Sequence, residues 1–194
     1  MSQSPLVSHE LPQVRENLHL TESELEQRFS DLAGSPLDEG EVTLLLSRPG
    51  SGQRSMPDRV LLSGESGMPD DRWTQLPVTD KTGNMQLSVM ETAVAELIAN
   101  GQDLCLFGDN LTFDLDISEQ NLPIGSVLQA GEARLEVTPE PHTGCDQYRF
   151  RFGRAALRYI SHKQRRAQRL RGVYMKVIQD GVVCVGDKIT VLSR

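Results

Sequence analysis

Apolar residues in this chain occur in short runs of strand length, and residues typical of turns separate these runs. EVTLLLSR at 41–48 and RVLLS at 59–63 are two such runs, with a Gly- and Pro-rich connection between them. At 133–137, Ala, Leu and Val alternate with charged residues, as in a strand with one buried face. We therefore predict a mainly β fold of mostly antiparallel strands, closed into a barrel or sandwich, with helices at its periphery.

The first 40 residues differ from the rest and are predicted to form an N-terminal arm with one short helix. Residues 1–20 are polar and lack periodicity, which favours a loose segment. Thr21 and Glu24 form a capping-box pattern that opens a helix over 21–33. With 194 residues in total, the chain has room for one domain of ordinary size, which we assign to residues 41–194.

Three further elements are predicted along the domain. Residues 64–83 read as a long loop, a helix follows from 85 to Asn100, and the basic stretch after Gly144 reads as a helix with a break near Ser161. Asp180-Gly181 lies between two valine-rich runs, which is typical of a β-hairpin. The stretch from 103 to 117 is predicted as a strand interrupted at Gly108.

Composition excludes several classes of protein. No run of about 18 apolar residues is present, so we expect no membrane span, and the N-terminus lacks a secretory signal pattern. Three cysteines, Cys105, Cys145 and Cys184, form neither a disulfide framework nor paired zinc knuckles. A reduced compartment, the cytoplasm, fits them best. Cys105 and Cys184 lie in apolar surroundings and are predicted to be structural.

Charge is distributed unevenly. Residues 149–171 hold nine basic residues and no Asp or Glu, so this segment contributes +9 to a net charge of −7 and the rest of the chain carries −16. A basic segment in an acidic molecule attracts small anions to one place, although a solvated helix face would show the same pattern. The acidic remainder would oppose a long polyanion, so nucleic acid is not expected as a partner.

Cys145 is the strongest candidate for a reactive residue in this sequence. It follows an exposed turn with two prolines and is predicted to begin a helix, beside the basic segment. The positive end of the helix and the nearby arginines both favour a thiolate, which is the form that binds a soft metal or carries sulfur. The alternative interpretation is that Cys145 is a small buried residue in the first turn of a helix, without a chemical role. His142 lies three residues earlier, but no second Cys/His pair completes a zinc site.

Several of these stretches together resemble the MOSC domain, the family named for the C-terminal domain of molybdenum cofactor sulfurases. The resemblance rests on FGDNLT at 107–112, LPIGSVLQAGEARLEVT at 122–138, HTGC at 142–145 and the block RLRGVYMKVIQDGVVCVGDKI at 169–189. These motifs follow one another in order over residues 41–192.

The resemblance implies a β-barrel-like fold, of the type also found in pyruvate kinase, with a site for the molybdenum cofactor. It places the catalytic and metal-binding role on Cys145, which would either ligate molybdenum or hold a persulfide. The residues expected to bind the cofactor around Cys145 are Gly108, Asp109, Asn110, His142, Thr143, Gly144, Arg169 and Arg171. Pyridoxal phosphate binding is implied only for the family as a whole. The first 40 residues of this chain are too few for the separate domain that binds pyridoxal phosphate in sulfurases.

Two functions follow as hypotheses. In the first, the protein binds the molybdenum cofactor through Cys145 and acts as a sulfur carrier or a small molybdenum-dependent reductase, with the cofactor or a sulfur donor or acceptor protein as partner. In the second, the scaffold is a non-catalytic module that uses residues 149–171 to bind a phosphorylated or acidic ligand.

Overall fold

A closed seven-stranded barrel forms one half of the molecule. The computed structural model describes residues 7–75 and 83–194, and within them the barrel has the strand order β11-β2-β6-β5-β9-β8-β7. Its strands are β2 (Glu39–Leu45), β5 (Leu87–Glu91), β6 (Leu111–Phe113), β7 (Val127–Ala130), β8 (Ala133–Val137), β9 (Val173–Gln179) and β11 (Lys188–Ser193). All neighbouring pairs are antiparallel except β5 and β6. The predicted fold class is confirmed.

Two small sheets lie beside the barrel. In the first, β4 (Arg59–Leu62) pairs antiparallel with β10 (Gly181–Cys184). In the second, β1 (His9–Glu10) pairs antiparallel with β3 (Gln53–Arg54), which ties the N-terminal segment to the connection that follows β2.

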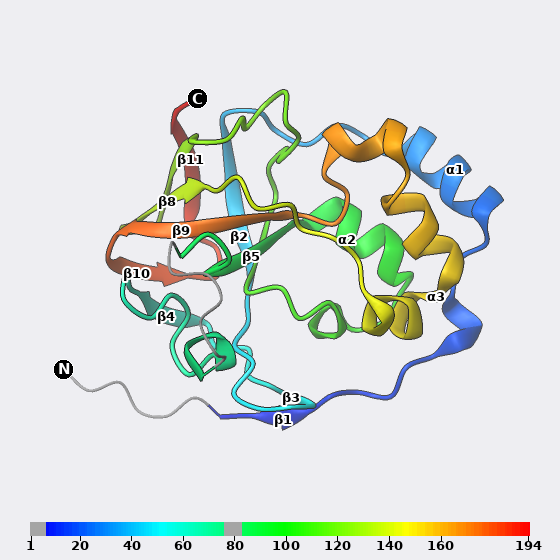
Figure 1. Cartoon of the computed structure of the whole chain (residues 1–194), viewed down its shortest axis with the longest axis horizontal. Coiled ribbons are helices and arrows are strands. Elements are labelled where there is room, and N and C mark those ends of the chain that lie inside the picture. The colour runs from blue at the N-terminus through cyan, green and yellow to red at the C-terminus, as the bar shows by residue number, and fades with distance from the viewer. Residues whose placement is uncertain (1–6, 76–82) are drawn as a thin grey trace.

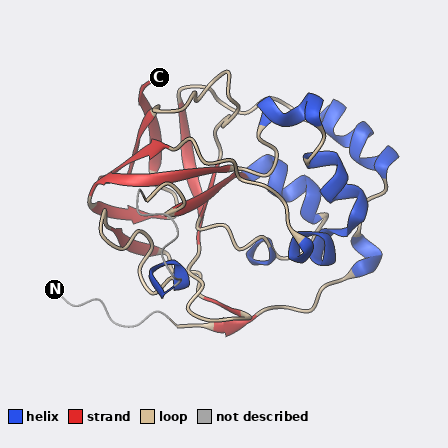
Figure 2. Ribbon diagram, in the orientation of Figure 1, coloured by secondary structure: helices blue, strands red, loops and turns tan. Residues whose placement is uncertain are grey.

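The α-helices gather on one side of the barrel, as Figures 1 and 2 show. They are α1 (Glu22–Asp31), α2 (Thr92–Ala99) and α3 (Asp146–Ile160). The short 3-10 turns are η1 (Glu16–Leu18), η2 (Arg72–Gln75), η3 (Leu104–Leu106) and η4 (Lys163–Gln168), of which η2 lies on the strand side near β4. The molecule therefore has two apolar cores. One fills the barrel around Phe113, and the other joins the helices around Phe152, which stacks on Phe107 with 3.9 Å between ring centroids.

Local sequence signals were correct where the structure depends on short-range contacts. The predicted capping box opens α1, with Thr21 and Glu24 bonded reciprocally, and the predicted strand over 133–137 alternates between buried and more exposed residues. The helix expected to end at Asn100 does so, in a left-handed conformation. The break near Ser161 is present between α3 and η4.

Two predicted helix and strand assignments were wrong. Residues 87–91 form β5 rather than the start of a helix, because Leu87 to Met90 are buried in succession and complete the barrel between β6 and β9. Residues 104–106 form η3 rather than a strand, because Asp103 caps the backbone N–H of Cys105. The kink within α3 at Gly153 was not predicted.

The predicted hairpin at Asp180-Gly181 was also wrong, although both strands exist. After the turn, β10 pairs with β4 while β9 pairs with β5 and β8. A Cβ atom on Gly181 would lie 2.2 Å from the carbonyl carbon of Glu132, so the chain crosses close over the β7–β8 turn at this point. The glycine permits this approach of two backbones, which is a use of Asp-Gly other than a hairpin.

The N-terminal segment, predicted to be loose, lies against the domain from residue 9 onward. Besides the β1–β3 pairing, the ring of His19 bonds the carbonyl of Arg151 on α3, and α1 packs against α3 with Phe29 stacked on Tyr159. Residues 1–6 and the part of the predicted long loop at 76–82 lie outside the described residues. The domain boundary at residue 40 stays a prediction, one residue after the start of β2.

Candidate functional site

A cavity of about 210 Å³ opens where the barrel meets the helices, and Cys145 lies in its lining. Of the residues that the structure describes, five arginines and one carboxylate, that of Asp109, line the same cavity. The arginines come from segments far apart in the sequence, and they are Arg48, Arg54, Arg72, Arg151 and Arg171. We call this the Cys145 cavity. Its positive charge suits an anionic ligand.

Cys145 occupies the N-cap position of α3, as the sequence predicted. Its backbone is extended, its side chain makes no capping hydrogen bond, and the residue is exposed, so its sulfur is free to meet a ligand. The preceding Gly144 packs under α3, where a Cβ atom would lie 2.3 Å from Cδ1 of Leu157. A side chain at position 144 would therefore clash with α3, so glycine allows the loop 142–144 to lie close to the helix. By contrast, Cys105 is buried, and burial raises the pKa of its thiol to about 12.

A buried ion pair forms one wall of the cavity. Arg171 Nη1 donates to Asp109 Oδ2 at 2.7 Å, and both side chains are largely removed from solvent. Burial would raise the pKa of Asp109, but the charge of Arg171, its hydrogen bond and the other cations nearby together outweigh burial and hold that pKa below its ordinary value. The pair is therefore ionised, and each charge stabilises the other.

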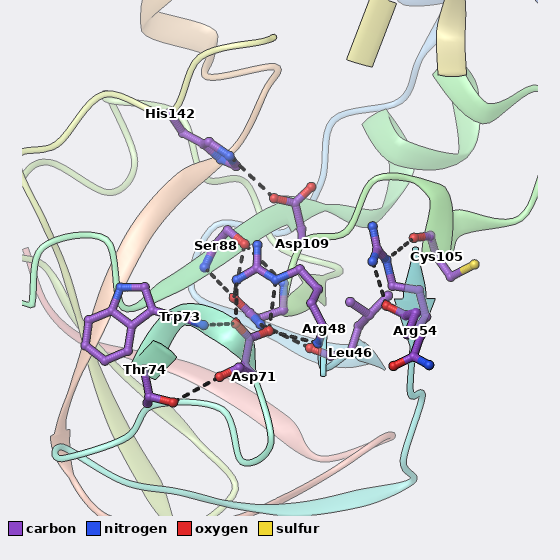
Figure 3. A network of polar contacts seen from close by, with 12 residues as sticks. Leu46, Arg48, Arg54, Asp71, Trp73, Thr74, Ser88, Cys105, Asp109 and His142 are labelled. Carbon is purple, nitrogen blue, oxygen red and sulfur yellow. Dashed lines mark hydrogen bonds and ion pairs between the residues drawn. The ribbon is translucent and has the colours of Figure 1, made fainter. Parts of the chain in front are cut away.

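His142 lies against this pair as a neutral ring. Its Nε2 is 3.6 Å from Asp109 Oδ1, in the relation that Figure 3 shows. Burial, reinforced by the charge of Arg171, lowers the pKa of His142 to about 3. The contact with Asp109 is therefore not an ion pair at neutral pH.

A second network orients Arg48. Asp71 accepts from the Arg48 backbone N–H, from its Nε and from its Nη2, and the guanidinium also donates to Asn110 Oδ1 (Figure 3). Asn110 is fully buried and donates in turn to Asp71 and to the Leu46 carbonyl, while its Oδ1 accepts from Ser88. The network joins β2, β5 and the 108–110 turn to the loop that carries Arg72.

Arg54 lies under the turn at Gly108. Its Nε donates to the Cys105 carbonyl at 3.1 Å, and a Cβ atom on Gly108 would lie 2.9 Å from its Nη2. Gly108 has a φ of +75°, so both its conformation and this close approach favour glycine. Burial, with the nearby charge of Arg151, lowers the pKa of Arg54 to about 10.

Four buried polar atoms around the cavity have no hydrogen-bond partner among the described residues. They are Tyr148 Oη, Arg171 Nε, Asp109 Oδ1 and His142 Nδ1. Buried polar groups without partners are rare and costly, and their gathering at one place is typical of a binding site. Tyr148 Oη–H and Arg171 Nε–H are donors, so an acceptor-rich ligand would satisfy them.

The structure brings together most of the residues predicted for the site. Gly108, Asp109, His142, Thr143, Cys145 and Arg171 line the Cys145 cavity. Asn110 supports it from the Arg48 network, and Gly144 and Arg169 line a neighbouring cavity instead. Arg169 Nη1 donates to the carbonyls of Ile117 and Leu122, which gives it a structural role in the 117–122 loop.

Sequence reasoning missed Arg48, Arg54, Arg72 and Tyr148 as site residues. No local pattern marks the three arginines, because only the closure of the barrel brings them to Cys145. Arg151 was noted only as part of the basic segment.

The basic segment 149–171 does not form one surface. Arg151 and Arg171 face the Cys145 cavity, whereas Arg158 and Arg165 pair with Glu22 and Glu26 of α1. Arg165 also lies over the ring of Tyr159. Two of the nine basic side chains thus attach α1 to α3 and to η4.

A comparison with family models matches residues 82–190, more than half of the chain, to the MOSC domain. The chain belongs to the MOSC domain family. This family is related to the molybdenum cofactor, and the matched residues include Cys145, the 108–110 turn and Arg171. A search of curated proteins gives no match.

Solved structures share the MOSC fold of this chain at low sequence identity. YuaD from Bacillus subtilis has a TM-score of 0.59 at 18% identity and covers 80% of this chain and 97% of its own. YiiM from Escherichia coli has a TM-score of 0.55 at 18% identity, over 80% of this chain and 70% of its own. YiiM from Geobacillus stearothermophilus has a TM-score of 0.53 at 14% identity and covers 83% of this chain and 76% of its own.

No cluster of three or more His, Cys, Asp or Glu side chains in residues 7–75 and 83–194 could hold a metal ion. Across the same residues, no helix is long and apolar enough to cross a membrane.

Proposed function

We propose that the Cys145 cavity binds an anionic, phosphate-bearing molybdenum cofactor, with Cys145 as the protein ligand of the metal. The observation that carries this proposal is the convergence of one exposed thiol with five arginines in a single cavity. A thiol suits a soft metal, and guanidinium groups suit phosphate oxygens. The membership in a family related to this cofactor supports the same ligand.

The residues that line the Cys145 cavity have the chemical character that such a cofactor requires. Arg72 and Arg151 offer donors at the cavity, Tyr148 Oη and Arg171 Nε are buried donors without acceptors, and Gly108 lets the backbone come close. At about 210 Å³ the cavity is smaller than the 300–1,000 Å³ usual for a whole ligand site. Part of the cofactor would therefore extend beyond its mouth. When bound, the group would supply redox chemistry at its metal.

The remaining side chains have positioning roles. Asp109 neutralises Arg171 and keeps its guanidinium in the wall, and Asp71 does the same for Arg48. Neutral His142 adds no charge beside the thiol. The protein would thus hold the cofactor by fixed donors that need little rearrangement on binding.

Sulfur carriage is a second role for the same atom, and the exposure of Cys145 favours it. A Cys145 thiolate would attack the outer sulfur of a persulfide on a donor protein. The donor S–S bond would break, the donor would leave as a thiolate, and Cys145 would retain the transferred sulfur. Three unpaired cysteines fit a reduced compartment such as the cytoplasm.

The binding-module hypothesis has less support. It requires the basic segment 149–171 to present one surface, and intramolecular pairs with α1 occupy Arg158 and Arg165.

Molybdenum and pterin content tests the cofactor proposal. Protein produced in a host that makes the cofactor is expected to hold both, in near-equal amounts. Arg72→Glu reverses one charge at the cavity and is expected to lower the molybdenum and pterin content. The control Arg154→Glu makes the same charge change on the exposed side of α3 and is expected to leave the content of both unchanged. Absence of metal and pterin from the wild type, or equal content in Arg72→Glu, contradicts the proposal.

A further inference from the structure

A second and larger cavity adjoins the Cys145 cavity. It has a volume of about 670 Å³, within the range of small-molecule sites, and it shares His142, Thr143 and Arg171 with the smaller cavity. We call it the η4 cavity, because Lys163 and Arg166 of that turn line it.

The lining of the η4 cavity combines an apolar surface with cations. Ile160, Leu170 and Val173 are buried and give the apolar part, and Ile124 adds an apolar side chain that is 60% exposed. Exposed apolar side chains beside a cavity favour contact with the apolar body of a ligand.

Two of the cations in this lining are already engaged. Arg171 is paired with Asp109, and Arg169 donates to backbone carbonyls within Coulombic range of Glu119. Lys163 and Arg166 are exposed, and their side chains form no ion pair with any described residue. Among the described residues, Glu140 is the one other carboxylate in the lining, so the two cations leave a net positive charge.

An unsatisfied polar atom lies in the wall as well. His142 Nδ1 is buried without a hydrogen-bond partner among the described residues, on a side chain that is only 5% exposed. It lies 3.2 Å from the point where a Cβ atom of Gly172 would be, and Gly172 also lines the η4 cavity. A side chain at position 172 would therefore narrow the space in front of the His142 ring.

We propose that the η4 cavity binds a small amphipathic anion, namely a carboxylate or phosphate attached to an apolar ring or chain. Lys163 and Arg166 would hold the anionic group, and Ile160, Leu170 and Val173 would contact the apolar body. This site is separate from the cofactor proposal and stands whether or not a cofactor binds beside Cys145.

Titration calorimetry of the full chain, purified without cofactor, tests this site with naphthoate as the probe. Two comparison compounds separate its parts: naphthalenemethanol keeps the ring without the charge, and acetate keeps the charge without the ring. Naphthoate is expected to bind about tenfold more tightly than either, a difference of about 1.4 kcal/mol. Equal binding of naphthoate and its neutral analogue overturns the proposal.

Variants locate the binding. Arg166→Glu is expected to weaken naphthoate binding about tenfold. Ile124→Ser, at a position whose side chain is 60% exposed, is expected to weaken naphthoate binding by a smaller factor. Arg154→Glu is the charge-matched control and leaves the affinity unchanged. Unchanged affinity in both Arg166→Glu and Ile124→Ser overturns the proposal.

The same titration separates the two cavities. Arg72→Glu and Cys145→Ser alter the Cys145 cavity only and are expected to leave naphthoate affinity at the wild-type value. A loss of affinity in Arg72→Glu that equals the loss in Arg166→Glu would place the anion beside Cys145 and overturn the assignment to the η4 cavity.

Discussion

At the scale of single residues, the site depends on buried charges that compensate each other. Asp109 and Arg171 form an ion pair almost out of contact with water, and His142 lies against the pair without a charge. Such pairs contribute little to net stability compared with apolar residues, but they are costly to break. The presence of such a pair in the wall of the Cys145 cavity fits a role in holding donors at a ligand site.

Removal of one partner of this pair tests its ionised state. Arg171→Met leaves the Asp109 carboxylate buried without its cation, and we expect a loss of about 3–5 kcal/mol in the free energy of unfolding. Urea denaturation at pH 7 measures it. The double variant Asp109→Leu/Arg171→Met removes both charges and should recover much of the loss. A single-variant loss below about 1 kcal/mol would contradict a buried ion pair.

The depressed pKa of His142 predicts a pH dependence of stability. Below its ordinary pKa of about 6.5 the unfolded chain takes up a proton on this ring, whereas the folded protein does not until about pH 3. Folding stability due to His142 is therefore full above pH 6.5 and falls as the pH is lowered toward 3. At pH 5 the loss is expected to reach about 2 kcal/mol.

The comparison of wild type with His142→Gln isolates this contribution. Between pH 7 and pH 5 the wild type should lose more stability in urea denaturation than the variant, whose side chain does not titrate. Asp109 does not interfere in this window, because its lowered pKa places its own contribution at more acidic pH. Parallel pH profiles for the two proteins would show that the ring is not held neutral.

At the scale of elements, the kink in α3 determines how the helical layer meets the N-terminal segment. Gly153 has φ +90° and ψ +161° and divides α3 into two helices, and a Cβ atom there would lie 3.1 Å from the His19 side chain. His19 in turn bonds the Arg151 carbonyl. The kink therefore makes room for the segment that leads into α1.

Gly153→Ala is expected to destabilise the fold by about 1–3 kcal/mol, from backbone strain and crowding against His19. Two glycines provide controls in the same urea measurement. Gly52→Ala, at φ +74° with open space around it, reports strain alone, and Gly34→Ala has neither feature. A loss at Gly153 no larger than at Gly34 would show that the helix can straighten there.

Elements set by local contacts were predictable, and those set by the barrel were not. The Thr21 capping box and the alternation over 133–137 carry their own signals. Strand β5 carries none, because a short buried apolar run reads as strand or helix until its neighbours are known. The Asp180-Gly181 turn likewise has the chemistry of a hairpin, and only the β4–β10 pairing shows where the chain goes.

At the scale of the whole molecule, closure of the barrel creates the site. Strands β2 and β6 bring Arg48 to the 108–110 turn, and α3 places Cys145 beside them. The sequence indicated Cys145 through a turn beside a charged segment, and Arg171 through the resemblance to the MOSC domain. It could not indicate Arg54 or Arg72, because residues so far apart along the chain meet only through tertiary structure.

X-ray absorption at the molybdenum edge tests the central claim most directly, namely that Cys145 is the metal's protein ligand. Wild-type protein, Cys145→Ser and the control Cys184→Ser are prepared from a host that makes the cofactor. We predict that the wild type and Cys184→Ser show one more sulfur bonded to molybdenum than Cys145→Ser. The same number of sulfur ligands in all three proteins would contradict the assignment of Cys145.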